Sequence, residues 1–199
     1  MTNPDPATAK RVQLASEAAA TIASMVPNAT DLARFVADHF CEVTAPEVSV
    51  RFDFMAMRPG GQGGGMIRKP GNILLNWRRL LMAVSESTLA GFGVAQQPWL
   101  IPFAALVIWN TLWSTLEIKI DERHAAVIWA LWLLRDESNK VSKASLPSRL
   151  NEKLGLYGQP PLTPTQLQLH LADLERMKCL ESKNSEYIWL REWVRPKWD

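Results

Sequence analysis

Residues 145–177 read SLPSRLNEKLGLYGQPPLTPTQLQLHLADLERM, and this stretch decides how the chain is expected to fold. In its first third, Leu146, Leu150 and Leu154 recur every four residues. Apolar residues at this spacing lie on one face of a helix, so a short helix is predicted. Gly155 is expected to end that helix, because glycine readily adopts the left-handed conformation found after helix ends.

A second helix is predicted from Thr163 onward. Thr163 can cap this helix, Pro164 suits its first position, and Gln166 completes a capping box. Its apolar face is expected to be buried, whereas its polar residues are expected to face outward. The residues of the apolar face are Leu167, Leu171, Leu174 and Met177.

A two-stranded hairpin is predicted after the second helix. Residues 178–183 and 186–193 flank the turn pair Asn184 and Ser185. Residues 187–190 alternate aromatic with aliphatic side chains, which is typical of a strand with one buried face. The order of the predicted elements is therefore helix, turn, helix and hairpin.

This order resembles the winged helix-turn-helix superfamily, on the segments SLPSRLNEKLGL, LTPTQLQLHLADLERMKCLES and EYIWLREW. The resemblance implies that residues 163–170 enter the major groove of DNA and that the hairpin touches the backbone or the minor groove. Glutamine and threonine side chains can contact base edges there. The nucleic-acid-binding residues expected on this basis are Lys143, Arg149, Thr163, Thr165, Gln166, Gln168, His170, Lys183 and Asn184.

The charge balance gives DNA binding little support. The 199 residues contain 22 Lys and Arg against 20 Asp and Glu, and a binder of phosphates usually has a clear cationic excess. Nine tryptophans are more than one small core needs, and tryptophan is enriched at protein interfaces. We therefore also consider a protein interface, formed by Trp99, Trp109, Trp113, Trp189 and Trp193.

Two domains are predicted, a helical region over residues 1–116 and a winged helix over residues 117–199. In the first, helices are expected from residue 5 to about residue 27, from about residue 28 to Phe40, and over Asn72–Val84. Alternating apolar residues predict a strand over Val48–Phe54. The fold class expected is mainly α with a small β component, the helical region being packed on the winged helix.

Residues 60–65 read GGQGGG and precede one of the predicted helices. Such a loop suggests phosphate binding, but it has neither the G-x-G-x-x-G spacing nor a following Gly-Lys-Ser/Thr. A surface loop is the simpler interpretation.

Residues 87–116 contain no charged residue and form the best candidate for a membrane span. Their strongly apolar core, residues 100–109, is shorter than the about 20 residues that a span needs. We therefore favour a buried or dimer-forming helix over residues 98–116, and a homo-oligomer is expected on this basis. A membrane-associated form is the weaker alternative.

The segment after this helix predicts a core shared by the two domains. Residues 117–120 alternate as a short strand would, and Asp121 can cap a helix over Glu122–Arg135. That helix is apolar on every side, so it must be covered on every side. It is expected to lie between the preceding helix, Pro102–Leu116, and the leucines of the two following helices, Leu150, Leu167, Leu171 and Leu174.

No motif predicts catalysis, a metal site or a cofactor. His39, His124 and His170 are isolated from one another in sequence, and no zinc pattern exists. Cys41 and Cys179 are expected to be free, buried thiols. No signal peptide is recognised, so the cytoplasm is the simplest location.

Two functions fit these observations. The first is a non-enzymatic winged-helix regulator that binds duplex DNA as a dimer. The alternative is an assembly subunit that docks a protein partner through its winged helix and exposed tryptophans.

Overall fold

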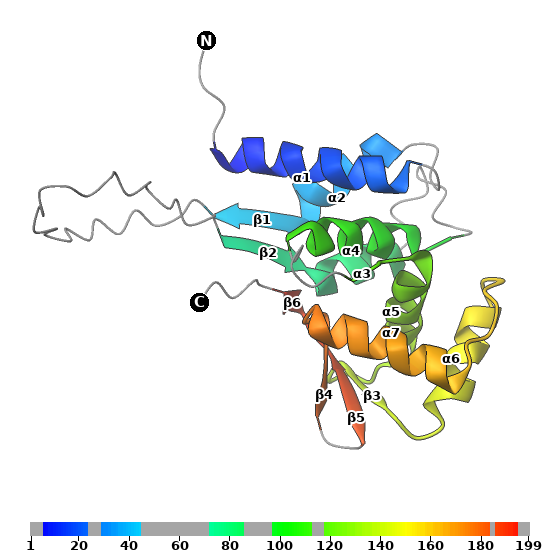
Figure 1. Cartoon of the computed structure of the whole chain (residues 1–199). Coiled ribbons are helices and arrows are strands. Elements are labelled where there is room, and N and C mark those ends of the chain that lie inside the picture. The colour runs from blue at the N-terminus through cyan, green and yellow to red at the C-terminus, as the bar shows by residue number, and fades with distance from the viewer. Residues whose placement is uncertain are drawn as a thin grey trace, which may run out of the picture.

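The computed structural model describes residues 6–23, 29–44, 72–85, 97–112, 118–183 and 186–194 (Figure 1). This part of the chain is mainly helical with two small antiparallel sheets, as the sequence predicts. The helices are α1 (Pro6–Ile22), α2 (Ala29–Phe40), α3 (Trp77–Ser85), α4 (Leu100–Leu112), α5 (Glu122–Leu134), α6 (Leu146–Gly155) and α7 (Pro164–Arg176). The strands are β1 (Cys41–Thr44), β2 (Asn72–Asn76), β3 (Lys140–Ser142), β4 (Leu180–Lys183), β5 (Tyr187–Leu190) and β6 (Trp193–Val194).

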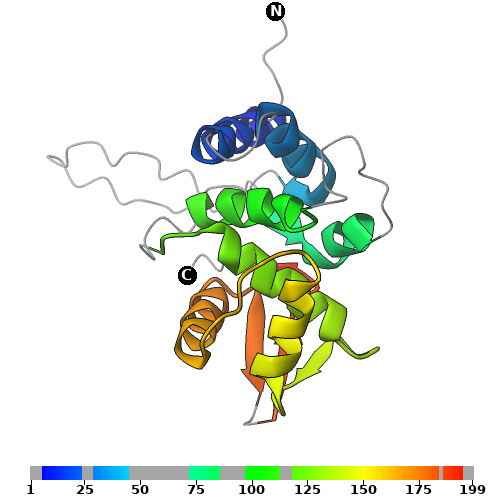
Figure 2. The ribbon, with the colours of Figure 1, turned by 90° about the vertical axis from the view of Figure 1, so that its right-hand side faces the viewer.

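Helices α1 and α2 form the layer at one end of the molecule and lie over α4 (Figures 1 and 2). The helix expected from about residue 28 to Phe40 is confirmed as α2. Leu32, Val36 and Phe40 are buried, and Phe35 is half-buried against the core.

The helix predicted over Asn72–Val84 is wrong in its first five residues, which form strand β2. This strand pairs antiparallel with β1, in a register that places Leu75 opposite Cys41. Asn76 then begins helix α3, because its side-chain oxygen accepts a hydrogen bond of 2.9 Å from the Arg79 backbone nitrogen. Pairing with a strand distant in sequence overrides the helical spacing of the apolar residues.

Helix α4 is a core helix of this chain. All residues from Leu100 to Trp109 are buried, because α1, α2, α3 and α5 pack around them. The face expected to form a dimer is thus already covered by the chain's own helices. Within the part of the chain that the structure describes, no helix is long and apolar enough to cross a membrane.

Helix α5 begins as predicted, with the Asp121 side chain accepting a hydrogen bond of 3.1 Å from the His124 backbone nitrogen. Residues 124–132 are all buried, which confirms that this helix is covered on every side. The strand expected just before it is not formed by residues 118–120. The Ile118 carbonyl instead accepts a hydrogen bond of 3.0 Å from the Asn110 side chain.

The C-terminal elements follow in the order α5, β3, α6, α7, β4 and β5, and their sheet has the order β3-β5-β4. Helices followed by a three-stranded sheet in this arrangement are consistent with a winged helix. Strand β5 buries Ile188 and Leu190 and turns Tyr187 outward, as its alternation predicts. The left-handed glycine, however, is Gly158 with φ of 69°, and Gly155 is the last residue of α6.

The two halves of the chain share a core, as predicted. The Trp109 indole nitrogen on α4 donates a buried hydrogen bond of 2.8 Å to the Met177 carbonyl at the end of α7. Strand β6 leaves the winged helix and pairs with β2, with Val194 opposite Leu75. Arg78 on α3 also forms an ion pair of 2.8 Å with Glu192. The hydrophobic core therefore continues across the predicted boundary at residue 116.

Several predicted features lie outside the described residues. They are the strand over Val48–Phe54, the glycine-rich residues 60–65, Trp113 and Asn184.

Candidate functional site

The exposed surface of α7 is the part of the winged helix that was expected to touch DNA. Its outward residues recur every third or fourth position, and they are Thr165, Gln168, Leu169, Ala172 and Arg176, here called the outer face of α7. The opposite side of the helix is fixed to the core by Leu167 and Leu174. A rigid helix therefore presents one polar, partly apolar stripe to the solvent.

Two residues predicted to contact bases have a structural role at the start of this helix. The Gln166 side-chain oxygen accepts hydrogen bonds from the Thr163 backbone nitrogen at 2.9 Å and from the Thr163 hydroxyl at 3.1 Å. The Thr163 hydroxyl also accepts a hydrogen bond of 3.2 Å from the Gln166 backbone nitrogen. These contacts confirm the predicted capping box, and they leave Thr165 and Gln168 as the exposed polar side chains best placed for a ligand.

The basic residues predicted around this helix are spread over several elements. Lys143 follows β3 and Arg149 lies on α6, and both side chains are half-buried. Lys183 ends β4, at the tip of the hairpin. Acidic residues are interleaved with them: Asp173 lies 3.5 Å from Arg176, and Glu181 pairs with Arg191. The surface around α7 is thus mixed in charge.

A cavity of about 470 Å³ lies between α7, the start of α6 and the hairpin. Leu146, Leu171 and Ile188 make much of its wall apolar, and Lys143 and Glu175 are its charged lining residues. Gln168 lies at this cavity as well as on the outer face of α7. Such a cavity could not be predicted from a local pattern, because its walls come from several separate elements.

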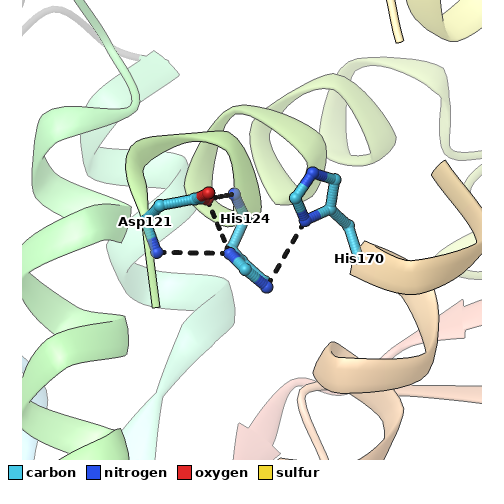
Figure 3. A group of neighbouring side chains, drawn as sticks. All are labelled: Asp121, His124 and His170. Carbon is cyan, nitrogen blue, oxygen red and sulfur yellow. Dashed lines mark hydrogen bonds and ion pairs between the residues drawn. The ribbon is translucent and has the colours of Figure 1, made fainter. Parts of the chain in front are cut away.

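His170 does not point outward with the other predicted DNA-binding residues. It faces α5, where its ring packs edge-on against His124 with ring centroids 4.5 Å apart (Figure 3). The Nδ1 atom of His170 lies 3.4 Å from Nε2 of His124. His170 therefore belongs to a cluster between two helices.

That cluster contains two carboxylates as well. Asp121 Oδ1 lies 2.7 Å from Nδ1 of His124, and Asp173 Oδ2 lies 3.5 Å from its Nε2. His124 is only 3% exposed, so its ring has little contact with water. The ligand atoms of Asp121, His124 and His170 all lie within 4.8 Å of one another.

The environment changes the protonation of this cluster. Burial opposes ionisation of Asp121, but its hydrogen bond with His124 and the charge of that ring outweigh burial and lower the pKa of Asp121 to about 2. Burial, followed by the neighbouring His124, lowers the pKa of His170. At neutral pH the cluster thus holds an ionised Asp121 beside a neutral His170.

The two thiols are free and buried, as expected. Burial raises the pKa of Cys41 to about 12, and it raises the pKa of Cys179 as well. A thiol that stays protonated is a poor nucleophile, so neither cysteine is poised for catalysis.

The predicted tryptophan interface is corrected in part. Trp99 and Trp109 are 3% and 0% exposed, because both belong to the hydrophobic core. Trp189 is half-buried on β5, where Lys140 lies 5.0 Å from the centre of its ring. Trp193 lies in β6. Trp99 and Trp109, which were predicted to contact a partner, are thus core residues.

No protein-family model, curated protein or solved structure matches this chain. Function is therefore argued from the geometry of the chain itself.

The histidine cluster is the feature that sequence reasoning missed. His124 and His170 are 46 residues apart, and no short motif connects them. The available signal was local: Asp121 and His124 have the spacing of a helix cap, and His170 and Asp173 share a face of the next long helix. Only the packing of α5 on α7 brings the two pairs together.

Proposed function

We propose that this protein is a non-enzymatic winged-helix protein that binds duplex DNA. The observation that carries the proposal is the outer face of α7, exposed along the helix in an arrangement of helices and strands consistent with a winged helix. The major groove of B-DNA admits an α-helix. A helix held by its buried side and unoccupied on its outer side suits that use.

The chemistry of the outer face supports readout of bases more than anchoring of phosphates. Gln168 can make two hydrogen bonds to adenine, Thr165 can contact several bases, and Leu169 is suited to the methyl group of thymine. The surroundings of α7 are mixed in charge, so the number of neutralised phosphates is expected to be small. Binding should accordingly depend on sequence and be moderate in its response to salt.

A selection experiment tests this proposal. Purified protein is incubated at low salt with a fluorescent pool of random-sequence duplexes, and the retained duplexes are amplified and measured by anisotropy. We expect one sequence class to be enriched. The Thr165→Ala/Gln168→Ala double variant should bind it at least about tenfold more weakly, because each lost base contact costs about 1–3 kcal/mol.

The control is Gln13→Ala, an exposed glutamine on α1 at the other end of the molecule. This variant should bind the selected duplex as the unchanged protein does. Failure to retain any duplex at low salt, or equal binding by the double variant, would refute the proposal.

A second candidate function is docking of a protein partner, and a specific observation favours it. Leu169 is 61% exposed in the middle of the outer face. A surface that binds DNA through polar groups alone would not need an exposed leucine there. A photoreactive amino acid at position 169 separates the two functions in cells. The DNA-binding proposal requires an adduct with DNA, whereas a protein adduct without a DNA adduct would favour docking.

A further inference from the structure

We propose that His124 and His170 bind a transition-metal ion of the zinc class, with Asp173 supplying a carboxylate and Asp121 orienting His124. The site would lie between the start of α5 and the middle of α7 (Figure 3). It does not depend on whether α7 binds DNA.

The first step concerns the proton on His124. Its Nδ1 lies 2.7 Å from Oδ1 of Asp121 and 3.3 Å from the Asp121 backbone nitrogen. A carboxylate can only accept, so the shorter contact places the proton on Nδ1. With the proton on Nδ1, the atom that can donate a lone pair to a metal ion is Nε2, which lies near His170 and Asp173 of α7.

The second step concerns the distance across the site. Two ligands at about 2.0–2.1 Å from a tetrahedral zinc ion lie about 3.3–3.4 Å apart. The observed separation of His124 Nε2 from His170 Nδ1 is 3.4 Å, and that of Nε2 from Asp173 Oδ2 is 3.5 Å. These two distances are long for hydrogen bonds and are close to the length of an edge in a metal tetrahedron.

The third step concerns the chemistry of the donors. Two imidazole nitrogens and one carboxylate oxygen form a ligand set typical of zinc sites that keep one position for water. A carboxylate bonded to the far nitrogen of a ligating histidine fixes the orientation of the ring, and Asp121 holds that place behind His124. Magnesium and calcium prefer sites made of oxygen alone, so they fit poorly here.

The burial of the donors favours a bound ion. His124 is 3% exposed, and Asp173 and His170 are half-buried. The lone pair of a buried imidazole needs a partner, and His170 offers only a long contact. A metal ion would accept a lone pair from His124 Nε2, from His170 and from Asp173 at the same time.

Calorimetric titration of the tag-free, EDTA-treated full chain with zinc chloride at neutral pH tests the site. We expect binding of one equivalent and a higher melting temperature with zinc than without it, with magnesium producing neither. His170→Ala should weaken zinc binding at least about tenfold, and Asp121→Asn should weaken it about 10–100-fold, as expected for a residue that orients a ligand. Cobalt in place of zinc should give the visible absorption of a tetrahedral ion.

The matched control is His39→Ala, which removes an exposed histidine on α2. It should bind zinc as tightly as the unchanged chain. His170 is half-buried, so its replacement should leave the fold intact, and circular dichroism of the variant verifies this. Absence of stoichiometric zinc binding, or equal binding by a folded His170→Ala variant, would overturn the proposal.

Discussion

At the scale of single residues, Asp121 combines a helix cap with a contact to a buried ring. Its carboxylate accepts from the His124 backbone and lies against the His124 imidazole. These contacts favour the ionised form, which is why the pKa of Asp121 falls to about 2 from its ordinary value of 3.8. The same residue therefore fixes where α5 begins and how His124 points.

The lowered pKa predicts a loss of stability in acid. A carboxylate whose pKa is lower in the folded than in the unfolded state stabilises the fold above the unfolded value, and this stabilisation is lost as pH falls from about 3.8 toward about 2. Asp121→Asn should therefore be less stable than the unchanged chain at pH above about 5, and the difference should shrink in acid. Urea unfolding with EDTA present, at several pH values, measures this gap. A gap independent of pH would contradict the assignment.

Trp109 is a second residue with a structural consequence. Its indole nitrogen donates to the Met177 carbonyl in a fully buried place. Trp109→Phe would leave that carbonyl only the weak, 3.8 Å contact from the Cys179 thiol and open space in the core, so it should lower the free energy of unfolding by about 1–3 kcal/mol. Urea unfolding checks this value. Trp189→Phe, on a half-buried side chain, should cost less, and an equal or larger cost would argue against the buried bond.

At the scale of elements, the sequence predicted correctly those features that depend on contacts between residues close in sequence. The capping residues Asp121 and Thr163 begin α5 and α7 as predicted, because a cap involves residues only a few positions apart. The strands β1, β2, β3 and β6 were not foreseen. Each pairs with a strand far away in the sequence, and apolar spacing alone does not reveal such a partner.

The candidate site, too, could be predicted only where it depends on local sequence patterns. The outer face of α7 could be foreseen in part, because exposure on a helix follows from its period. The cluster of His124, His170 and the two carboxylates could not be foreseen, since it depends on how α5 packs against α7. A tertiary contact of this kind has no local pattern.

The orientation of α7 predicts effects of very different size for two of its leucines. Leu174 is 0% exposed, and Leu174→Ala should lower the free energy of unfolding by about 2–5 kcal/mol through the cavity it leaves. Leu169→Ala, in the same helix but 61% exposed, should change it by no more than about 0.5 kcal/mol. Chemical unfolding of both variants tests the orientation of the helix. Similar costs at the two positions would mean that α7 is rotated about its axis.

At the scale of the whole molecule, the C-terminal helices and their sheet share a hydrophobic core with the N-terminal helices. Helix α5 is covered by α4 on one side and by α6 and α7 on another, and β6 completes a sheet begun by β1 and β2. Removing the N-terminal half would expose the apolar surface that α5 packs against α4. Exposed apolar surface of this extent costs stability and promotes association.

We therefore predict that residues 118–199 alone do not form a stable monomer. The full chain should unfold in one cooperative transition, with tryptophan fluorescence and circular dichroism changing together. The fragment should aggregate or lack a cooperative transition, as light scattering and thermal melting would show. A monomeric fragment with the melting temperature of the full chain would refute the shared core.

The pairing of β6 with β2 also sets an order of events during synthesis. A ribosome makes β1 and β2 early, but the strand that covers the other edge of β2 is made only after α4, α5, α6, α7 and the hairpin. Until Val194 has emerged, the backbone groups on that edge of β2 have no strand partner, and an open edge invites pairing with other chains. The nascent chain is thus most prone to misassembly while the C-terminal helices and hairpin are still being translated. This period ends when β6 pairs with β2.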